Sequence, residues 1–261
     1  MPELPEVEEA MQRLRTAVEG KTIAQVRAHH PALERQLPAA TARRLRQQQI
    51  VKVERRGKHQ LMHLANGSTL HAHFRMNGDW LITRADEPLE KFTRASIDLT
   101  DGTRIELHDS RALSSMKLHA KGENPLPRLG MEANDESLDA DYLRAALSKR
   151  RGPIKPALMD QAVVAGLGNI YAAESLWMAR ISPKAVASSI SRSRLAKLAE
   201  SIHAVLEKEN RPPGRYTDAE NRHRFQVYDR EGKTCSRCAS TIRRIPQAGR
   251  STYFCPKCQR S

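Results

Sequence analysis

Two short cysteine pairs, Cys235-Ser236-Arg237-Cys238 and Cys255-Pro256-Lys257-Cys258, decide how the C-terminal part of this 261-residue chain folds. Each pair places two thiols across a tight turn, and 255 − 238 − 1 = 16 residues separate the pairs. This spacing is typical of a tetrahedral zinc site. Two disulfides, or four unrelated thiols, are the alternative that the symmetric spacing disfavours. We expect one structural zinc ion, because four thiolates leave no open coordination position. Its ligands would be Cys235, Cys238, Cys255 and Cys258.

The segment between the cysteine pairs predicts a β-hairpin. Residues 241–245 and 251–255 can pair as strands around residues 246–250, and the tip then presents Arg250 beside Gly249. A module this short lacks a core of its own. The binding energy of the metal, on the order of 10 kcal/mol, would fold it.

Helical periodicity precedes the zinc module. Three apolar residues at helical spacing predict a first helix: Leu158, Ala162 and Ala165. Residues 166–169 predict a break and residues 170–178 a second helix, and two helices joined by a tight glycine turn form a helix-turn-helix-like unit. A third helix is expected over residues 191–209, ended by the Pro-Pro-Gly at residues 212–214.

The first half of the chain begins with an amphipathic helix and continues as β-structure. One helical stripe is apolar: Val7, Ala10, Met11, Leu14, Ala17 and Val18. Gly20 would end this helix. From about residue 21 to 118 apolar residues alternate, and Asn66-Gly67 and Asp101-Gly102 mark tight hairpin turns. This half predicts an antiparallel β-sandwich or barrel led by one helix.

Changes in these patterns predict the domain boundaries. We expect an N-terminal β-sandwich domain over residues 1–130, a linker over 131–152, a helical domain over 153–222 and a zinc finger over 223–261. The linker is placed where Pro, Gly and charged residues become frequent.

The net charge indicates a polyanionic partner. The chain has 44 Lys+Arg against 30 Asp+Glu, a formal charge of +14. Basic clusters recur along the sequence without a block-like tail, so the charge should lie on folded surface, and nucleic acid is the favoured partner. No run approaches the roughly 20 apolar residues that cross a bilayer. The N-terminus also lacks the pattern of a signal peptide, so we expect a cytoplasmic protein without a membrane partner.

The opening Met1-Pro2-Glu3-Leu4-Pro5-Glu6 can carry chemistry. Removal of Met1 before a small residue would expose a secondary amine on Pro2. An α-amino group titrates near 8, so this amine is a nucleophile near neutral pH and can attack C1′ of a sugar. Glu3 is its neighbour and Glu6 lies one helical turn further. The alternative, which the residues alone favour, is that these prolines and acids only begin and cap a helix.

Four motifs resemble the formamidopyrimidine-DNA glycosylase and endonuclease VIII family. They are Met1–Glu8, Arg56-Gly57-Lys58, the segment from Leu158-Met159-Asp160-Gln161 to Gly168-Asn169-Ile170-Tyr171, and the four-cysteine finger. Their order and spacing match along nearly the entire chain, and Leu4 is more similar to the formamidopyrimidine branch. The resemblance implies an α+β multidomain fold. Its parts would be an N-terminal antiparallel β-sandwich with a leading helix, a helix-two-turns-helix domain and a C-terminal zinc-ribbon β-hairpin.

The resemblance implies catalytic roles for five residues. Pro2 would be the Schiff-base nucleophile that displaces the damaged base. Glu3 would be the acid that manages proton transfers, with support from Glu6. Lys58 would contact a phosphate beside the lesion and assist β-elimination, while Arg250 would grip the lesion phosphate and favour δ-elimination.

The resemblance also implies six DNA-binding residues: Met76, Arg94, Arg111, Leu113, Lys155 and Asn169. Met76, Arg111 and Leu113 would fill the space that a flipped nucleotide leaves in the duplex, unless Met76 is an ordinary core residue. Leu113 replaces the aromatic residue of the family, so lesion search or opposite-base preference would differ. Lys155 would add a cation, and Asn169, at an N-cap position, would offer donors to phosphate. Cations from both domains would pinch the DNA backbone on both sides of the lesion.

A second departure concerns base specificity. The formamidopyrimidine branch carries a longer glycine-containing loop that closes over an everted 8-oxoguanine. Here only residues 211–224 are available for that loop, and residues 220–224 are more similar to endonuclease VIII. The opening motif and this loop therefore indicate different branches.

The resemblance, taken with these residues, implies a bifunctional DNA glycosylase and AP lyase of base excision repair. It would remove oxidised bases of the formamidopyrimidine or 8-oxoguanine type and cut the strand by β,δ-elimination. Its partner would be double-stranded DNA with oxidised bases or abasic sites, bound by a monomer in a bacterial-type, nucleoid-associated setting. The alternatives are an endonuclease VIII-like enzyme for oxidised pyrimidines and a catalytically silent binder of damaged DNA. A zinc-ribbon transcription or ribosomal accessory protein leaves Pro2 and Glu3 unexplained.

Overall fold

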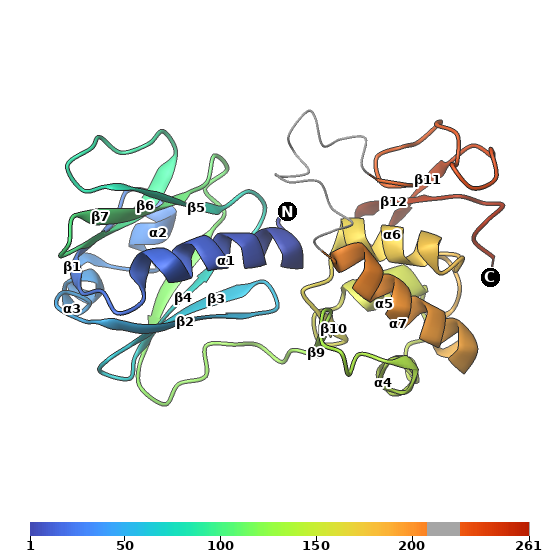
Figure 1. Ribbon diagram of the computed structural model, residues 1–261, viewed down its shortest axis with the longest axis horizontal. Helices are drawn as coiled ribbons and strands as arrows, with labels where there is room; N and C mark the ends of the chain where they lie inside the picture. The colour runs from blue at the N-terminus through green and yellow to red at the C-terminus, as the bar shows by residue number, and fades with distance from the viewer. Residues whose placement is uncertain (208–224, 261) are drawn as a thin grey trace. The chain divides into compact units, whose positions relative to one another are not determined.

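The structure is a computed structural model that describes residues 1–207 and 225–260. It divides into two compact units, Met1–Pro127 and Arg128–Ser261. Figure 1 shows that the first unit is mainly β-structure behind one long helix and the second mainly helical with a small hairpin. The predicted α+β class is confirmed. The division into four segments stays a prediction, and residues 131–152, expected to be a linker, contain an ordered strand and helix.

The first unit contains three helices and two four-stranded sheets in which every strand pair is antiparallel. The helices are α1 (Leu4–Val18), α2 (Pro31–Glu34) and α3 (Ala39–Arg44). One sheet has the order β1 (Ile23–Ala28), β6 (Thr93–Leu99), β7 (Thr103–His108), β5 (Asp79–Arg84). The other has the order β2 (Ile50–Arg56), β3 (His59–Leu64), β4 (Thr69–His73), β8 (Ser115–His119). This is the predicted sandwich.

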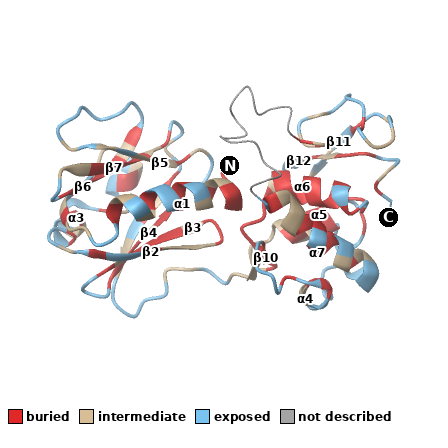
Figure 2. Cartoon of the chain, in the orientation of Figure 1, coloured by how far each residue is buried: buried red, intermediate tan, exposed pale blue. Residues whose placement is uncertain are grey.

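The sequence patterns explain how the sandwich closes. Ile97 pairs with Ile105 across β6 and β7, as their alternation predicts. Gly67 and Gly102 have φ of +82° and +85°, which the expected tight turns require. The apolar stripe of α1 faces the common core, and Figure 2 shows its opposite face exposed. The helix ends at Val18, shortly before Gly20 at φ +79°.

The second unit surrounds helix α6 (Asn169–Met178), whose residues from Ile170 to Trp177 are all buried. The other elements are β9 (Met131–Glu132), α4 (Ala140–Leu147), α5 (Ile154–Met159), β10 (Val164–Ala165), the 3-10 helix η1 (Ala187–Ser189), α7 (Arg192–Leu206), β11 (Arg243–Gln247) and β12 (Arg250–Phe254). Helices α5 and α7 and strand β12 pack against α6, and α4 packs against α7.

The first predicted helix of this unit is shorter than its apolar pattern indicates. Helix α5 ends at Met159, and Ala165 lies in β10 beside β9, so the expectation of a helix through Ala165 was wrong. Polar side chains after the helix bind local backbone instead. Asp160 Oδ1 accepts from the N–H of Ala162 at 3.0 Å, and the Gln161 amide bonds the carbonyls of Met159 and Leu167.

The third predicted helix also ends early. Helix α7 ends at Leu206, and Glu207 is already extended. Residues 208–209, the Pro-Pro-Gly at 212–214 and the expected lesion loop at 211–224 lie outside the described residues. No helix within residues 1–207 and 225–260 is long and apolar enough to cross a membrane.

The zinc-ribbon hairpin is confirmed, with its strands shifted slightly from the expected positions. Strands β11 and β12 pair antiparallel from Arg243↔Phe254 to Gln247↔Arg250. Ala248 and Gly249 form the two-residue turn with φ of +47° and +71°, as a type I′ turn requires. Arg250 therefore stands exposed at the hairpin tip, next to Gly249.

Candidate active site and nucleic-acid interface

The α-amino group at the start of the chain lies in a charged, partly buried part of the first unit. Burial lowers the pKa of the Met1 amine below its usual value of 8.0. Glu3 and Glu6 act in the opposite direction, while the charges of Lys58 and Arg111 lower this pKa further. Four of the selected side chains are thus within electrostatic reach of one amine. A lower pKa enlarges the deprotonated, nucleophilic fraction at neutral pH.

Glu3 and Glu6 hold each other at the start of α1. Glu3 is the N-cap and is only 2% exposed. Its N–H donates to Glu6 Oε2 at 3.0 Å, and its carboxylate accepts from the N–H of Glu6, which is a capping box. The helix-capping interpretation of these acids is therefore correct as geometry. This geometry is also compatible with a chemical role, because the same capping hydrogen bonds hold a buried carboxylate beside the amine.

A two-residue turn between β2 and β3 places Lys58 inside the first unit. Gly57 has φ +57°, which glycine adopts without steric cost. Arg55 fastens this turn, because its guanidinium donates to the carbonyl of Gly57 at 2.9 Å and to Glu8 Oε2 at 2.5 Å. Lys58 is only 4% exposed. Its ammonium is thus fixed near the amine by a turn that is itself tied to α1.

Met76 and Leu113 are large apolar side chains that project into solvent. They are 40% and 47% exposed. Met76 lies in the turn between β4 and β5, and the alternative that it belongs to the core is wrong. Arg111 is exposed in the loop between β7 and β8, two residues before Leu113. All three side chains are available to enter a duplex.

The two loops that carry these side chains are fastened to each other. Ser114 Oγ lies 3.2 Å from the carbonyl oxygen of Phe74, and Asn77 Nδ2 donates to Ser110 Oγ at 2.6 Å. Gly78 permits this approach, because a Cβ there would lie 2.6 Å from Ser114 Oγ. The structure therefore brings Met76 and the Arg111–Leu113 loop together.

Asp109 is the centre of the second loop. Its fully buried carboxylate accepts from the N–H groups of Arg111, Leu113 and Ser114 at 2.9, 2.7 and 2.8 Å, and from Ser114 Oγ at 2.7 Å. Burial would raise the pKa of Asp109, but the hydrogen bonds, led by those from Ser114, outweigh burial and lower it. An ionised carboxylate thus shapes the loop.

Arg94 also supports this loop. Its Nε donates to the carbonyl of Asp109 at 2.6 Å and its guanidinium to the carbonyl of Ser110 at 3.3 Å. The guanidinium carbon lies 5.6 Å from the ring centre of Phe92. In this structure Arg94 positions the loop that carries Arg111, and DNA binding by Arg94 itself stays a prediction.

Lys155 and Asn169 are joined to the zinc hairpin in the second unit. Lys155 is 1% exposed, and its Nζ donates to Asn169 Oδ1, to Thr252 Oγ1 at 2.8 Å and to the Ser251 carbonyl at 3.3 Å. Asn169 Nδ2 donates to the same Ser251 carbonyl at 3.2 Å. Ser251 follows Arg250, so the three predicted phosphate ligands of this unit lie on adjoining segments. If a phosphate bound to Lys155, its oxygen would take the place of one of these acceptors.

The predicted N-cap position of Asn169 was wrong by one residue. Gly168 is the N-cap of α6, with extended φ and ψ of −134° and −156°, and Asn169 is the first helical residue. Because its side chain bonds Lys155 and β12, it is not available to cap the helix. Gly168 itself has no side chain with which to cap α6.

The four cysteines form one cluster. All four sulfur atoms lie within 4.8 Å of one another, with Cys238–Cys255 at 3.4 Å and Cys235–Cys258 at 4.0 Å. A tetrahedral site with Zn–S bonds of about 2.3 Å requires sulfur separations of about 3.8 Å. The four thiols therefore fit a tetrathiolate zinc ion.

Three family models cover most of the chain in the order of these parts. Residues 1–116 match the formamidopyrimidine-DNA glycosylase N-terminal domain, and residues 129–212 match the formamidopyrimidine-DNA glycosylase H2TH domain. Residues 232–260 match a zinc finger found in FPG and IleRS. The chain belongs to the formamidopyrimidine-DNA glycosylase family.

Curated members of the family match from end to end. The formamidopyrimidine-DNA glycosylase of Herpetosiphon aurantiacus is 37% identical, over 99% of this chain and 100% of its own. The formamidopyrimidine-DNA glycosylase of Dinoroseobacter shibae is 38% identical over 100% of both chains.

Solved structures of the family have the same fold. MutM in complex with DNA containing carbocyclic 8-oxo-G has a TM-score of 0.88 at 31% identity, with both chains covered completely. Lactococcus lactis formamidopyrimidine-DNA glycosylase, bound non-covalently to DNA containing an AP site, has a TM-score of 0.89 at 31% identity. It covers 99% of this chain and 100% of its own. Together with the cysteine cluster, the zinc-finger match establishes one structural zinc ion in this member of the family.

Sequence analysis missed two buried carboxylates that organise this glycosylase fold. One is Asp109. The other is Glu174 on α6, which accepts from the N–H groups of Gln226, Val227 and Tyr228 at 2.8, 2.9 and 2.8 Å. Burial raises the pKa of Glu174, and these three donors oppose that effect. The signal that could have revealed Glu174 is an acid within an otherwise apolar helix.

Proposed function

We propose that this chain excises oxidised bases from DNA through an N-terminal proline amine and then cuts the strand by β,δ-elimination. Membership of the family makes the chain a base-excision-repair glycosylase with AP lyase activity. The assignment of residues rests on one observation about the α-amine. Its pKa is influenced by four charged side chains: Glu3, Glu6, Lys58 and Arg111. A water-using glycosylase needs no such amine, whereas a bifunctional one does.

The proposed chemistry follows from these groups. With Met1 removed, the deprotonated Pro2 nitrogen attacks C1′ of the damaged nucleotide, and the bond from C1′ to the base breaks. Glu3, buried beside the amine, supplies the proton that the leaving base or the opening sugar requires. The C1′–O4′ bond then opens, O4′ takes up a proton and the Pro2 nitrogen loses its own, which gives an iminium adduct between Pro2 and the ring-opened sugar. Loss of a C2′ proton then expels the 3′ phosphate, and a second elimination expels the 5′ phosphate.

The DNA contacts that we propose belong to each unit separately. In the first unit Met76, Arg111 and Leu113 enter the duplex where the base has left it, and Lys58 contacts a neighbouring phosphate. In the second unit the connected group of Lys155, Asn169 and Arg250 binds the backbone. The proposal for Met76, Arg111 and Leu113 is supported by the exposure of their side chains. The proposal for Lys155 and Asn169 is supported by the hydrogen bonds that both make to β12.

For the base we propose oxidised purines of the formamidopyrimidine and 8-oxoguanine type. The curated relatives are named for formamidopyrimidine, and one solved relative holds carbocyclic 8-oxo-G. Excision rates on matched duplexes, one with 8-oxoguanine and one with an oxidised pyrimidine, test this choice. Faster excision of the pyrimidine would assign the chain to endonuclease VIII-like specificity. We propose action as a monomer in the cytoplasm, at the nucleoid.

Borohydride trapping tests the nucleophile. The mature protein, with Met1 removal confirmed by mass, should form a reduced covalent complex with an abasic-site duplex. A protein that retains Met1 carries its amine on the wrong residue and should form little adduct. Pro2→Gly replaces the secondary amine with a primary amine at the same place and serves as the matched variant, with reduced but detectable trapping. Absence of any adduct with the mature protein would leave only a silent DNA binder.

A further inference from the structure

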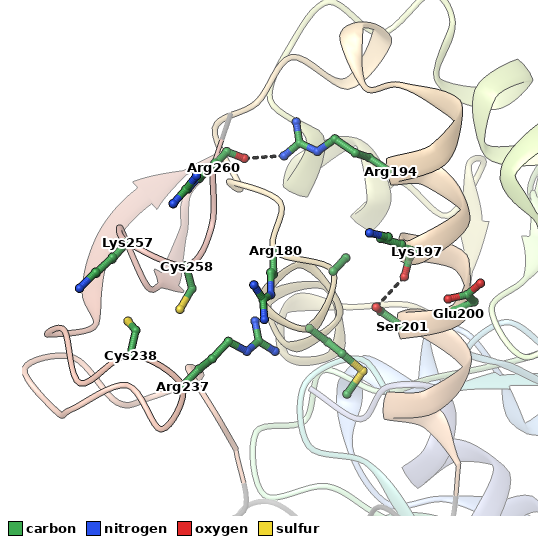
Figure 3. A pocket seen from close by; sticks show the side chains of 12 residues that line it. Arg180, Arg194, Lys197, Glu200, Ser201, Arg237, Cys238, Lys257, Cys258 and Arg260 are labelled. Carbon is green, nitrogen blue, oxygen red and sulfur yellow. Dashed lines mark hydrogen bonds between the residues drawn. The ribbon is translucent and has the colours of Figure 1, made fainter.

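A basic cavity of about 890 Å³ lies in the second unit, away from the residues assigned to the lesion. Six cations line it against the single acid Glu200, a formal charge of +5: Arg180, Arg194, Lys197, Arg237, Lys257 and Arg260. Figure 3 shows these side chains around a space between α7, the end of α6 and the zinc knuckles. The cavity is at the C-terminal end of α6, whereas Asn169 begins that helix about 15 Å away.

Acids within residues 1–207 and 225–260 do not neutralise the cations of this cavity. In the part of the chain that the structure describes, none of the six forms an ion pair with a carboxylate. Cys238 and Cys258 also line the cavity, and a zinc tetrathiolate carries two negative charges. Subtracting them leaves a formal +3. The zinc site therefore accounts for only part of this positive charge.

Arg180 occupies a backbone position that normally favours glycine. Helix α6 ends in a Schellman motif: the N–H of Ile181 donates to the Leu176 carbonyl at 2.9 Å, and the N–H of Arg180 to the Trp177 carbonyl at 3.1 Å. Arg180 then has φ +58°, which a residue with a Cβ adopts at an energetic cost. Its guanidinium points into the cavity in Figure 3. A strained backbone that presents a charge to a cavity indicates a functional constraint.

Other contacts fix the walls of the cavity before any ligand binds. Arg194 donates to the Arg260 carbonyl at 2.6 Å, so the last described residue is held against α7. Arg237 donates to the Trp177 carbonyl at 2.9 Å, and its guanidinium lies 3.9 Å from the ring centre of Trp177. The guanidinium groups of Arg194 and Arg237 are therefore already oriented before an anion binds.

We propose that this cavity binds phosphoryl groups at a site separate from the lesion site. A phosphate monoester carries up to two charges and three acceptor oxygens, and a DNA strand places singly charged phosphodiesters next to one another, so several cations can share either ligand. A single carboxylate offers one charge and two oxygens, which leaves more of the formal +3 unsatisfied. The source is either the backbone of a DNA segment outside the lesion or a free phosphorylated small molecule.

Calorimetry with the zinc-loaded full chain tests the site. The free-phosphate probe is fructose bisphosphate, the DNA probe is a short lesion-free duplex, and a glutamate peptide represents acidic protein. The variant is Arg180→Gly with Lys197→Gln. Arg180→Gly suits the backbone at φ +58°, so we expect an unchanged or raised thermal midpoint. The control, Arg144→Gln with Lys233→Gln, removes two exposed charges of the same unit outside the cavity.

The expected result is about tenfold weaker bisphosphate binding by the cavity variant and unchanged binding by the control. If DNA is the source, the duplex competes with bisphosphate for the cavity. The slope of log K against log salt concentration for duplex binding then decreases in magnitude by about 0.9 for each cation removed. If duplex binding is unchanged, a free phosphate compound is the source. The proposal is overturned if both probes bind the wild type and the cavity variant equally, or if neither binds. Tighter cavity-dependent binding of the glutamate peptide would also overturn it.

Discussion

At the scale of single residues, Asp109 shapes the loop that carries Arg111 and Leu113. Asp109→Asn removes the charge and turns an NH2 group toward donors, so some of the four hydrogen bonds are lost inside the protein. We expect about 3 kcal/mol lower free energy of unfolding and weaker binding of lesion duplex, measured by urea unfolding and by titration. Asp86→Asn, on a side chain that is 72% exposed, should change stability by less than about 0.5 kcal/mol. Equal losses in the two variants would contradict the role of Asp109.

The residues that the sequence could identify are those whose motif is contiguous. Glu3, Lys58 and the cysteines stand in short motifs. The structure clusters the cysteines as their spacing predicts, and it buries Glu3 and Lys58, whose catalytic roles stay predictions. The role of Asp109 depends on a loop that closes around its carboxylate. The position of Lys155 depends on a hydrogen-bond acceptor, Thr252, that lies 97 positions away in the sequence. Such partners have no signature in a single sequence.

At the scale of elements, the sheet of β3 and β4 holds three histidines whose charged forms are disfavoured. Burial, with nearby positive charges, lowers the pKa of His59 and His71 to about 4 and of His73 to about 3. The unfolded chain binds these protons near pH 6.5, so protons favour unfolding between about pH 6.5 and 4. We expect stability to fall by at least about 3 kcal/mol across this range in urea unfolding. His71→Gln should reduce the fall, while His203→Gln, outside the sheet, should not.

Element types followed from periodicity, but helix ends did not. The alternation of apolar residues and the two X-Gly turns predicted the sandwich, because one face of each strand must be buried. The apolar spacing of Leu158 and Ala165 predicted a longer helix than α5. Asp160 and Gln161 ended it by bonding local backbone groups, a competition that periodicity does not register.

At the scale of the whole molecule, each unit has its own core, and the zinc hairpin is part of the second. Cys238→Ser, or removal of zinc by a chelator, should release β12 and leave the buried Lys155 ammonium without Thr252 and Ser251 as acceptors. Hydrogen exchange should then rise in residues 230–260 and in the first turn of α6. The sandwich of the first unit should keep its protection, because its core contains no residue of the second unit. Restoring zinc should reverse the effect in the wild type only. Uniform loss of protection in both units would show that the metal supports the entire chain, and unchanged exchange would show that it supports neither unit.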